Sequence, residues 1–294
     1  MKPIRALLVY LTVVFSGAAL AAPWVYRLVQ NLAPGSGIAL QPFHRYVNRC
    51  LLVLALAGLW PLLRFLNIRS RTTVGWVPIS GQGRNIRLGF ALGFASLALA
   101  ACLPMIAGAR IWQTGDGAGQ WLQHITNAAL SAIVVSFLEE LLFRGAVFGT
   151  LRRVHSFPSA ALISASIYSL VHFFDRPAPP ASVDAWTGWA TLGQMLHGFT
   201  TLHQLVPGFF TLALAGGLLA WARERTGSLW FGIGLHAGWI FWLKAFGFLT
   251  REASPAATTA FWGSSRLYDG WPAFGVLAVI ALFLAPRWRN ARSP

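Results

Sequence analysis

Two adjacent carboxylates, Glu139 and Glu140, stand inside an apolar stretch of the chain. Arg144 follows Glu140 by four residues, and on a helix this order of acid and base favours an ion pair on one face. Phe143 holds the equivalent position for Glu139, so the sequence predicts that Glu139 is the carboxylate available for chemistry. An ionisable group in a membrane segment is a candidate functional group, because hydrocarbon does not solvate its charge.

Two histidines, His172 and His236, also fall deep in apolar segments. Together with Glu139 they form a candidate centre, since each polar group needs a partner inside the protein. One hypothesis is a divalent metal such as zinc, bound by Glu139, His172 and His236, with water at the open position. The other needs no cofactor: Glu139 is the general base for a water, and the histidines donate to the oxyanion. Both hypotheses lead to hydrolysis.

The composition excludes an ordinary soluble domain. The 294 residues are 56% hydrophobic and only 11% charged, whereas about a quarter of the residues in soluble domains are charged. Apolar runs of roughly 17–25 residues are long enough to cross a bilayer. The sequence therefore predicts an all-α, polytopic membrane protein with about eight transmembrane helices, at about residues 4–22, 50–66, 87–107, 121–148, 158–174, 205–222, 228–248 and 271–285.

The charge distribution predicts the topology of these helices. The formal net charge is +15, and basic pairs such as Arg152 with Arg153 and Arg223 with Arg225 lie between alternate spans. This positive-inside pattern places both termini in the cytoplasm, and we expect a bacterial inner membrane. No basic stripe with interleaved aromatic residues occurs, so we expect no nucleic acid partner. The expected partners are the lipid bilayer and a peptide or protein substrate.

Two segments need a separate interpretation. The first span resembles a signal peptide, but a proline directly after the candidate cleavage site, Pro23, favours an uncleaved helix. Residues 175–180 contain three prolines, which end the fifth span because proline cannot donate a helical hydrogen bond. The aromatic residues 186–198 that follow are predicted to form a short interfacial helix or lid.

The order of these motifs resembles the CPBP family, the CAAX-processing and bacteriocin-processing intramembrane proteases also called Abi. The resemblance covers about residues 121–245 and rests on Glu139-Glu140-x-x-x-Arg144, Tyr168-x-x-x-His172, the segment 223–230, and His236. It implies an intramembrane endopeptidase with Glu139 as the water-activating base. His172 and His236 then orient water or stabilise the oxyanion, and Glu140 and Arg144 support the site. The chain accordingly divides into N-terminal membrane helices (1–120), a protease core (121–248), and a C-terminal loop with the last helix (249–294).

The chain departs from the family pattern at one informative position. The family usually has asparagine four residues after the second histidine, whereas this chain has Ile240. Isoleucine cannot donate to an oxyanion, and losing one such donor costs about 100- to 1,000-fold in rate. Tyr168 replaces the usual phenylalanine, and its hydroxyl supplies the donor only if it points into the centre. The other donors considered are His197, His203, Gln204 and the more distant Asn127.

Three functions remain open from the sequence. The first is an intramembrane endopeptidase. The second is a catalytically inactive relative that acts as a membrane scaffold or immunity factor, which Ile240 favours. The third is a transporter or proton relay, but the intramembrane acids are confined to one helix and no inverted repeat is found. For the first function, the resemblance implies a prenylated CAAX tail as one possible substrate, and a leader, pheromone, bacteriocin or sorting-signal peptide is the alternative.

Overall fold

The fold is that of an all-α membrane protein, as the sequence predicts. The computed structural model describes residues 2–68, 70–113, 117–254 and 261–289. Within these ranges, six helices are long and apolar enough to cross a membrane: Pro3–Leu32, Phe43–Phe65, Gly83–Ile106, Ala118–Arg152, Leu202–Thr226 and Trp230–Leu249. Two predicted spans, 158–174 and 271–285, coincide with shorter apolar helices, Phe157–Phe173 and Trp271–Leu284. The prediction of eight full-length spans is therefore confirmed for six.

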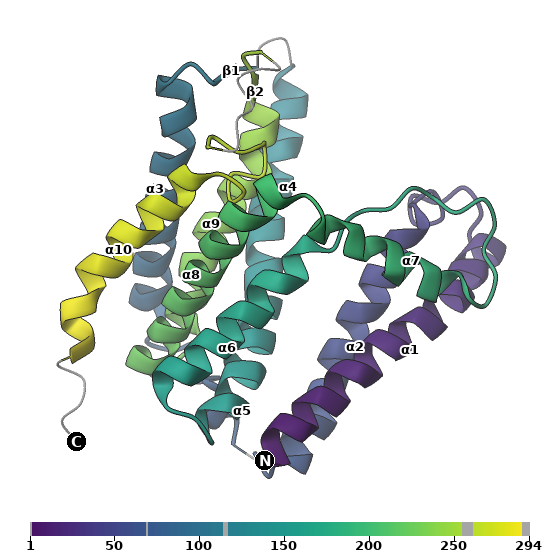
Figure 1. The fold of residues 1–294 in the computed structure, drawn as a ribbon, viewed down its shortest axis with the longest axis horizontal. Helices are drawn as coiled ribbons and strands as arrows, with labels where there is room; N and C mark the ends of the chain where they lie inside the picture. The colour runs from purple at the N-terminus through teal and green to yellow at the C-terminus, as the bar shows by residue number, and fades with distance from the viewer. Residues whose placement is uncertain (1, 69, 114–116, 255–260, 290–294) are drawn as a thin grey trace. The chain divides into compact units, whose positions relative to one another are not determined.

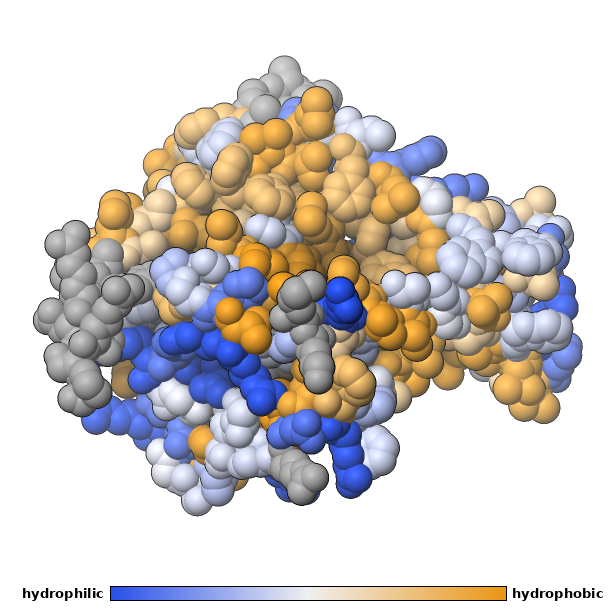
Figure 2. Space-filling view, turned by 60° about the horizontal axis from the view of Figure 1, so that its bottom comes forward, coloured by the Kyte–Doolittle hydropathy of each residue, from blue (hydrophilic) through white to orange (hydrophobic). Residues whose placement is uncertain are grey.

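Large apolar side chains lie on the outside of the protein. On the fourth span, Leu122, Leu130, Ile133 and Val134 are between 54% and 68% exposed. Figure 2 shows hydrophobic side chains over much of the visible surface. Soluble monomers rarely expose apolar patches of this extent, because water disfavours them. This surface is suited to lipid, and the protein is an integral membrane protein.

The described chain forms two compact units. The first unit comprises Met1–Arg69 and Val171–Thr201. Its helices are α1 (Lys2–Leu32), α2 (Phe43–Phe65), the 3-10 turns η3 (Val171–Phe173) and η4 (Leu196–Phe199), and between these turns α7 (Thr187–Met195). α1 packs against α2 and α7 (Figure 1). The helical character predicted for residues 186–198 is confirmed, while their place at the membrane surface stays a prediction.

The first helix is longer than the sequence predicts. It was expected to end at residue 22, but it continues through Pro23 to Leu32. Proline leaves the carbonyl of Ala19 without its helical donor. α7 packs closely at this point, where a Cβ on Gly188 would overlap the Ala19 carbonyl oxygen. The helix therefore tolerates Pro23 where a neighbouring helix covers the carbonyl that loses its bond.

The second unit contains the remaining helices and comprises Ser70–Leu170 and Leu202–Pro294. α9 packs against α3, α4 and α8, and α6 packs on α8 (Figure 1). Two three-residue strands form an antiparallel ribbon, which the sequence did not predict because such short strands show no periodicity. The elements are η1 (Arg71–Val74), α3 (Gly83–Ile106), β1 (Arg110–Trp112), α4 (Ala118–Glu139), η2 (Glu140–Phe148), α5 (Gly149–Arg152), α6 (Phe157–Leu170), α8 (Leu202–Thr226), α9 (Trp230–Leu249), β2 (Thr250–Glu252) and α10 (Trp271–Arg289).

Glycines set the close approach of α3 to α9. Gly89 and Gly93 on α3 contact the α9 backbone, and Gly234 and Gly238 on α9 contact the α3 backbone. A Cβ at any of the four would overlap main-chain atoms of the other helix. Both pairs have the small-xxx-small spacing that lets membrane helices pack tightly. Because His236 lies between Gly234 and Gly238, this packing fixes the segment that carries the histidine.

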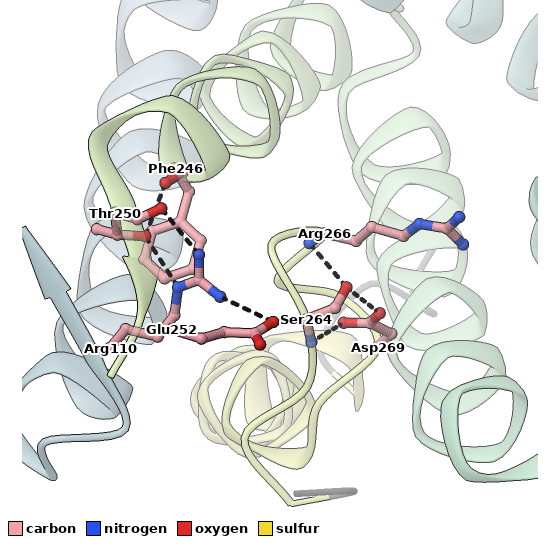
Figure 3. A network of polar contacts seen from close by, with 7 residues as sticks. All are labelled: Arg110, Phe246, Thr250, Glu252, Ser264, Arg266 and Asp269. Atoms are coloured by element: carbon pink, nitrogen blue, oxygen red, sulfur yellow. Dashed lines mark hydrogen bonds and ion pairs between the residues drawn. The ribbon is translucent and has the colours of Figure 1, made fainter. Parts of the chain in front are cut away.

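A buried arginine lies across the C-terminal end of α9 (Figure 3). Arg110 Nε donates to Thr250 Oγ1 and Nη2 donates to the Thr250 carbonyl, each at 2.9 Å. The guanidinium carbon lies 4.8 Å from the centroid of the Phe246 ring, and Nη1 lies 3.9 Å from Glu252. Burial lowers the pKa of Arg110, and the charges of Glu252 and Asp269 oppose this shift. The cation joins the ribbon to the negative end of the α9 helix dipole.

Candidate active site

The helix changes its geometry between the two glutamates. α4 ends at Glu139, and a π-helix follows from Glu140 to Phe148. The span predicted at 121–148 is confirmed as part of one continuous helix, Ala118–Arg152, although the sequence did not predict its π-helical segment. In a π-helix the hydrogen bonds run from i to i+5, and such turns are frequent at functional sites. The two neighbouring carboxylates differ in exposure: the Glu139 side chain is 23% exposed, and the Glu140 side chain is 1% exposed.

Glu140 has two partners inside the second unit. The expected ion pair is present, with Arg144 Nη1 3.3 Å from Glu140 Oε1 and both side chains 1% exposed. The same oxygen lies 3.0 Å from Nδ1 of His236. This second bond could not be predicted from the sequence, because it joins residues 96 positions apart on different helices. Gly232 leaves room for the carboxylate, since a Cβ there would lie 3.0 Å from Glu140 Oε2.

The imidazole of His236 connects the two glutamates. It is 3% exposed, and its Nε2 lies 3.7 Å from Glu139 Oε2. We assign the Nδ1 proton to the bond with the Glu140 carboxylate, because an ionised carboxylate can only accept. In the neutral imidazole, Nε2 then carries the lone pair and faces Glu139. Glu140 thus orients His236, a role that the spacing of residues along the chain did not indicate.

Tyr168 points into this centre. Its hydroxyl lies 3.2 Å from His236 Nε2, and the residue is 3% exposed. The Arg144 guanidinium carbon lies 4.2 Å from the centroid of the Tyr168 ring, and the Phe143 ring meets the same ring edge-on, with centroids 5.1 Å apart. The Tyr168 hydroxyl therefore points into the centre, as a substitute hydrogen-bond donor must.

The remaining predicted residues are His172, Ile240 and the other candidate donors. His172 is half-buried in η3 and belongs to the first unit, so its approach to Glu139 and His236 stays a prediction. Ile240 is 5% exposed and packs in an apolar cluster with Ala132 and Ala237. The other donors considered in the sequence do not form part of a buried centre: His197, His203 and Asn127 are exposed, and Gln204 is half-buried.

Whether Glu139, His172 and His236 bind a metal ion stays a prediction. In the described part of the chain, no three His, Cys, Asp or Glu side chains are arranged to hold one. Glu140 is already engaged by a guanidinium and by Nδ1 of His236. A zinc site needs three or four converging donors, and a cation beside the carboxylates opposes a second positive charge. We therefore derive no step through a metal.

An apolar groove runs beside the α9 segment that carries His236. Its volume is about 670 Å³, and it lies between α3, α4 and α9. Ala132, Gly234 and Ala237 keep it open because their side chains are small or absent. Bulkier residues form the rest of the lining together with Ser136 and Ala129: Ile86, Arg87, Phe90, Ile133, Phe137, Trp230, Ile233 and Phe241. Ser136, which also lines the groove, lies one helical turn before Glu140 in the sequence.

One family model matches the segment that contains these residues. It is described as type II CAAX prenyl endopeptidase Rce1-like and covers residues 119–242, which is under half of the chain. No curated protein and no solved structure matches the chain. Glu139, Glu140, Arg144, Tyr168 and His236 all fall within the matched segment. Residues 119–242 therefore carry the Rce1-like CAAX endopeptidase pattern, and the resemblance to the CPBP family of membrane proteases is confirmed for this segment.

Proposed function

We propose that this protein is an intramembrane endopeptidase that uses Glu139 as a general base, without a metal. The observation that carries the proposal is the position of His236, whose Nε2 lies 3.7 Å from Glu139 Oε2 while Nδ1 is held by Glu140. A half-buried carboxylate and a buried imidazole thus face the same space. General bases act when they lie within reach of the proton that they remove, directly or through one water.

The reaction is hydrolysis of a peptide bond. Glu139 takes a proton from water as the water oxygen attacks the carbonyl carbon, which gives a tetrahedral oxyanion. The carbon–nitrogen bond then breaks, and the proton on Glu139 passes to the leaving nitrogen. Glu140 keeps His236 in one orientation, and His236 positions the water through Nε2. In this proposal His172 is the second orienting group, as the family resemblance implies.

The groove supports a substrate with a long apolar group. It is lined almost entirely by apolar side chains and lies beside the α9 segment that carries His236. We infer that it receives the apolar part of the substrate, and the family description makes a prenylated CAAX peptide the first candidate. Arg87 lines the groove as well. This basic residue agrees with the proposed orientation, in which both termini and this end of α3 face the cytoplasm of a bacterial inner membrane.

Peptide cleavage in reconstituted vesicles tests the proposal. The probe is an internally quenched peptide that ends in a farnesylated Cys-aliphatic-aliphatic-Met sequence. We expect Glu139→Gln to abolish cleavage, because the amide cannot accept a proton. Glu224→Gln is the matched control, since Glu224 is paired with Arg152 at a partly exposed position away from the centre. Full activity of Glu139→Gln, with a correctly folded protein, contradicts the proposal.

A second experiment tests the groove. Ala237→Trp places a large ring in it, and Leu122→Trp is the control because Leu122 is 68% exposed and lies outside the groove. We expect Ala237→Trp to raise KM for the farnesylated peptide more than for the same peptide without the farnesyl group. Equal effects on the two peptides show that the groove does not bind the apolar group.

Ile240 favours a second candidate function, an inactive relative that acts as a membrane scaffold. Ile240 is part of an apolar cluster and offers no donor. For such a protein, Glu139→Gln leaves the cellular phenotype intact, and the wild type cleaves neither prenylated nor unprenylated peptides. A wild type that cleaves the farnesylated probe removes this candidate.

A further inference from the structure

The Tyr168 hydroxyl lies beside the imidazole and the carboxylate that the proposed function uses. It lies 3.2 Å from His236 Nε2, the nitrogen that also lies 3.7 Å from Glu139 Oε2. The Tyr168 hydroxyl and the proposed base, Glu139, therefore both face Nε2 of His236. The inference developed here rests on the proposed function, because an oxyanion forms only if a peptide bond is hydrolysed.

Packing holds the Tyr168 ring in position. Arg144 lies over its face at 4.2 Å, and Phe143 meets it edge-on at an interplanar angle of 86°. The cation above the ring withdraws electron density from it, which makes the hydroxyl a better donor. A donor that is fixed before substrate binds needs no reorganisation during the reaction, and this is the main source of oxyanion stabilisation in enzymes.

The expected donor is missing from its usual place. Ile240 lies one turn after His236, buried at 5% exposure against Ala132 and Ala237. This position can supply no hydrogen bond from its side chain. Losing a single oxyanion donor typically lowers kcat by about 100- to 1,000-fold. An active enzyme therefore needs a substitute, and a buried hydroxyl already points at the centre from α6.

We propose that Tyr168 is a catalytic residue that donates its hydroxyl hydrogen to the carbonyl oxygen of the scissile peptide. Without substrate, the hydroxyl donates to the lone pair of His236 Nε2. When the peptide binds, the O–H bond turns towards the carbonyl oxygen and stabilises the negative charge that forms there. Tyr168 keeps its proton throughout. The proton from water still goes to Glu139 and then to the leaving nitrogen.

Tyr168→Phe tests this role because it removes only the oxygen atom. With the farnesylated peptide in vesicles, we expect kcat to fall about 100- to 1,000-fold while KM changes by less than about threefold. Tyr10→Phe is the matched control, because its buried hydroxyl donates to the Ala55 carbonyl at 2.7 Å outside the proposed centre. We expect this control to keep its kcat.

A tetrahedral inhibitor separates a catalytic role from a structural one. The probe is the same peptide with a phosphinate in place of the scissile amide, which mimics the charged intermediate. We expect Tyr168→Phe to weaken phosphinate binding by about the same factor as it lowers kcat. Unchanged phosphinate binding, or a kcat within threefold of the wild type, overturns the inference while the proposed function stands. A wild type that cleaves no peptide refutes the proposed function and the inference with it.

Discussion

Removing Glu140 should destabilise the protein far more than removing Glu139. Glu140 and Arg144 are each 1% exposed, so Glu140→Ala leaves a buried guanidinium without its counter-charge. In the described part of the chain, the two terminal nitrogens of Arg144 have no hydrogen-bond acceptor besides this ion pair. Breaking a buried pair in this way costs about 3–5 kcal/mol. The loss of the Glu140 bond to His236 Nδ1 adds to this cost.

The cost of removing Glu139 is smaller because its side chain is 23% exposed, whereas that of Glu140 is 1% exposed. Deleting an active-site group often leaves stability unchanged or improved. We therefore expect Glu140→Ala to lower the midpoint of thermal unfolding by on the order of 10 °C, and Glu139→Ala to change it little.

Thermal unfolding of the detergent-solubilised protein, monitored by size-exclusion chromatography after heating, measures the midpoint shifts of Glu139→Ala and Glu140→Ala. Glu224→Ala is the control for a partly exposed pair, because Arg152 and Glu224 are 40% and 35% exposed, and such pairs contribute about 1 kcal/mol or less. The double variant Glu140→Gln/Arg144→Met should recover much of the loss, since it leaves no buried charge unpaired. Equal shifts for Glu139→Ala and Glu140→Ala refute this division of roles.

Three further predictions concern the frame of the site. Gly93→Leu should destabilise the protein by about 1–3 kcal/mol or more in thermal unfolding. Gly217→Leu should not, because a Cβ at Gly93 would meet the backbone of α9, whereas one at Gly217 has open space around it. Arg110→Gln should cost about 1.5–3 kcal/mol through its lost charge-assisted bonds at the end of α9; a shift below the error of the unfolding assay contradicts this. Hydrogen bonds from Thr187 and from the Trp186 amide lower the pKa of Asp184. Its stabilisation of the α7 start is therefore present above the unfolded value of about 3.9 and is lost as pH falls through the folded pKa, which amide exchange at the α7 start measures.

The helices and the local ion pair could be predicted from the sequence because both depend on short-range patterns. The lengths of the apolar runs predicted the spans, and the spacing of four residues predicted the ion pair of Glu140 with Arg144. The change to a π-helix at Glu140 leaves no mark in hydrophobicity, so the sequence did not predict it within the fourth span. Likewise, Pro23 signals a helix end by itself, and only the packing of another helix explains why α1 continues.

The long-range contacts of the site were beyond local reasoning. His236 was identified as a buried polar group, but its bond to Glu140 depends on how α9 packs against the π-helix. One signal was present and was overlooked: Gly89 with Gly93, and Gly234 with Gly238, have the spacing of tightly packed membrane helices. That spacing indicates a close helix contact at His236, although it does not name the partner helix.

The most direct test of the central claim is whether hydrolysis depends on a carboxylate or on a metal. The measurement is cleavage of the farnesylated peptide by reconstituted wild type after dialysis against a strong zinc chelator, with metal content determined on the same sample. We predict unchanged kcat in the chelated wild type and no detectable cleavage by Glu139→Gln. Loss of activity on chelation, with recovery on addition of zinc at about one ion per chain, contradicts it.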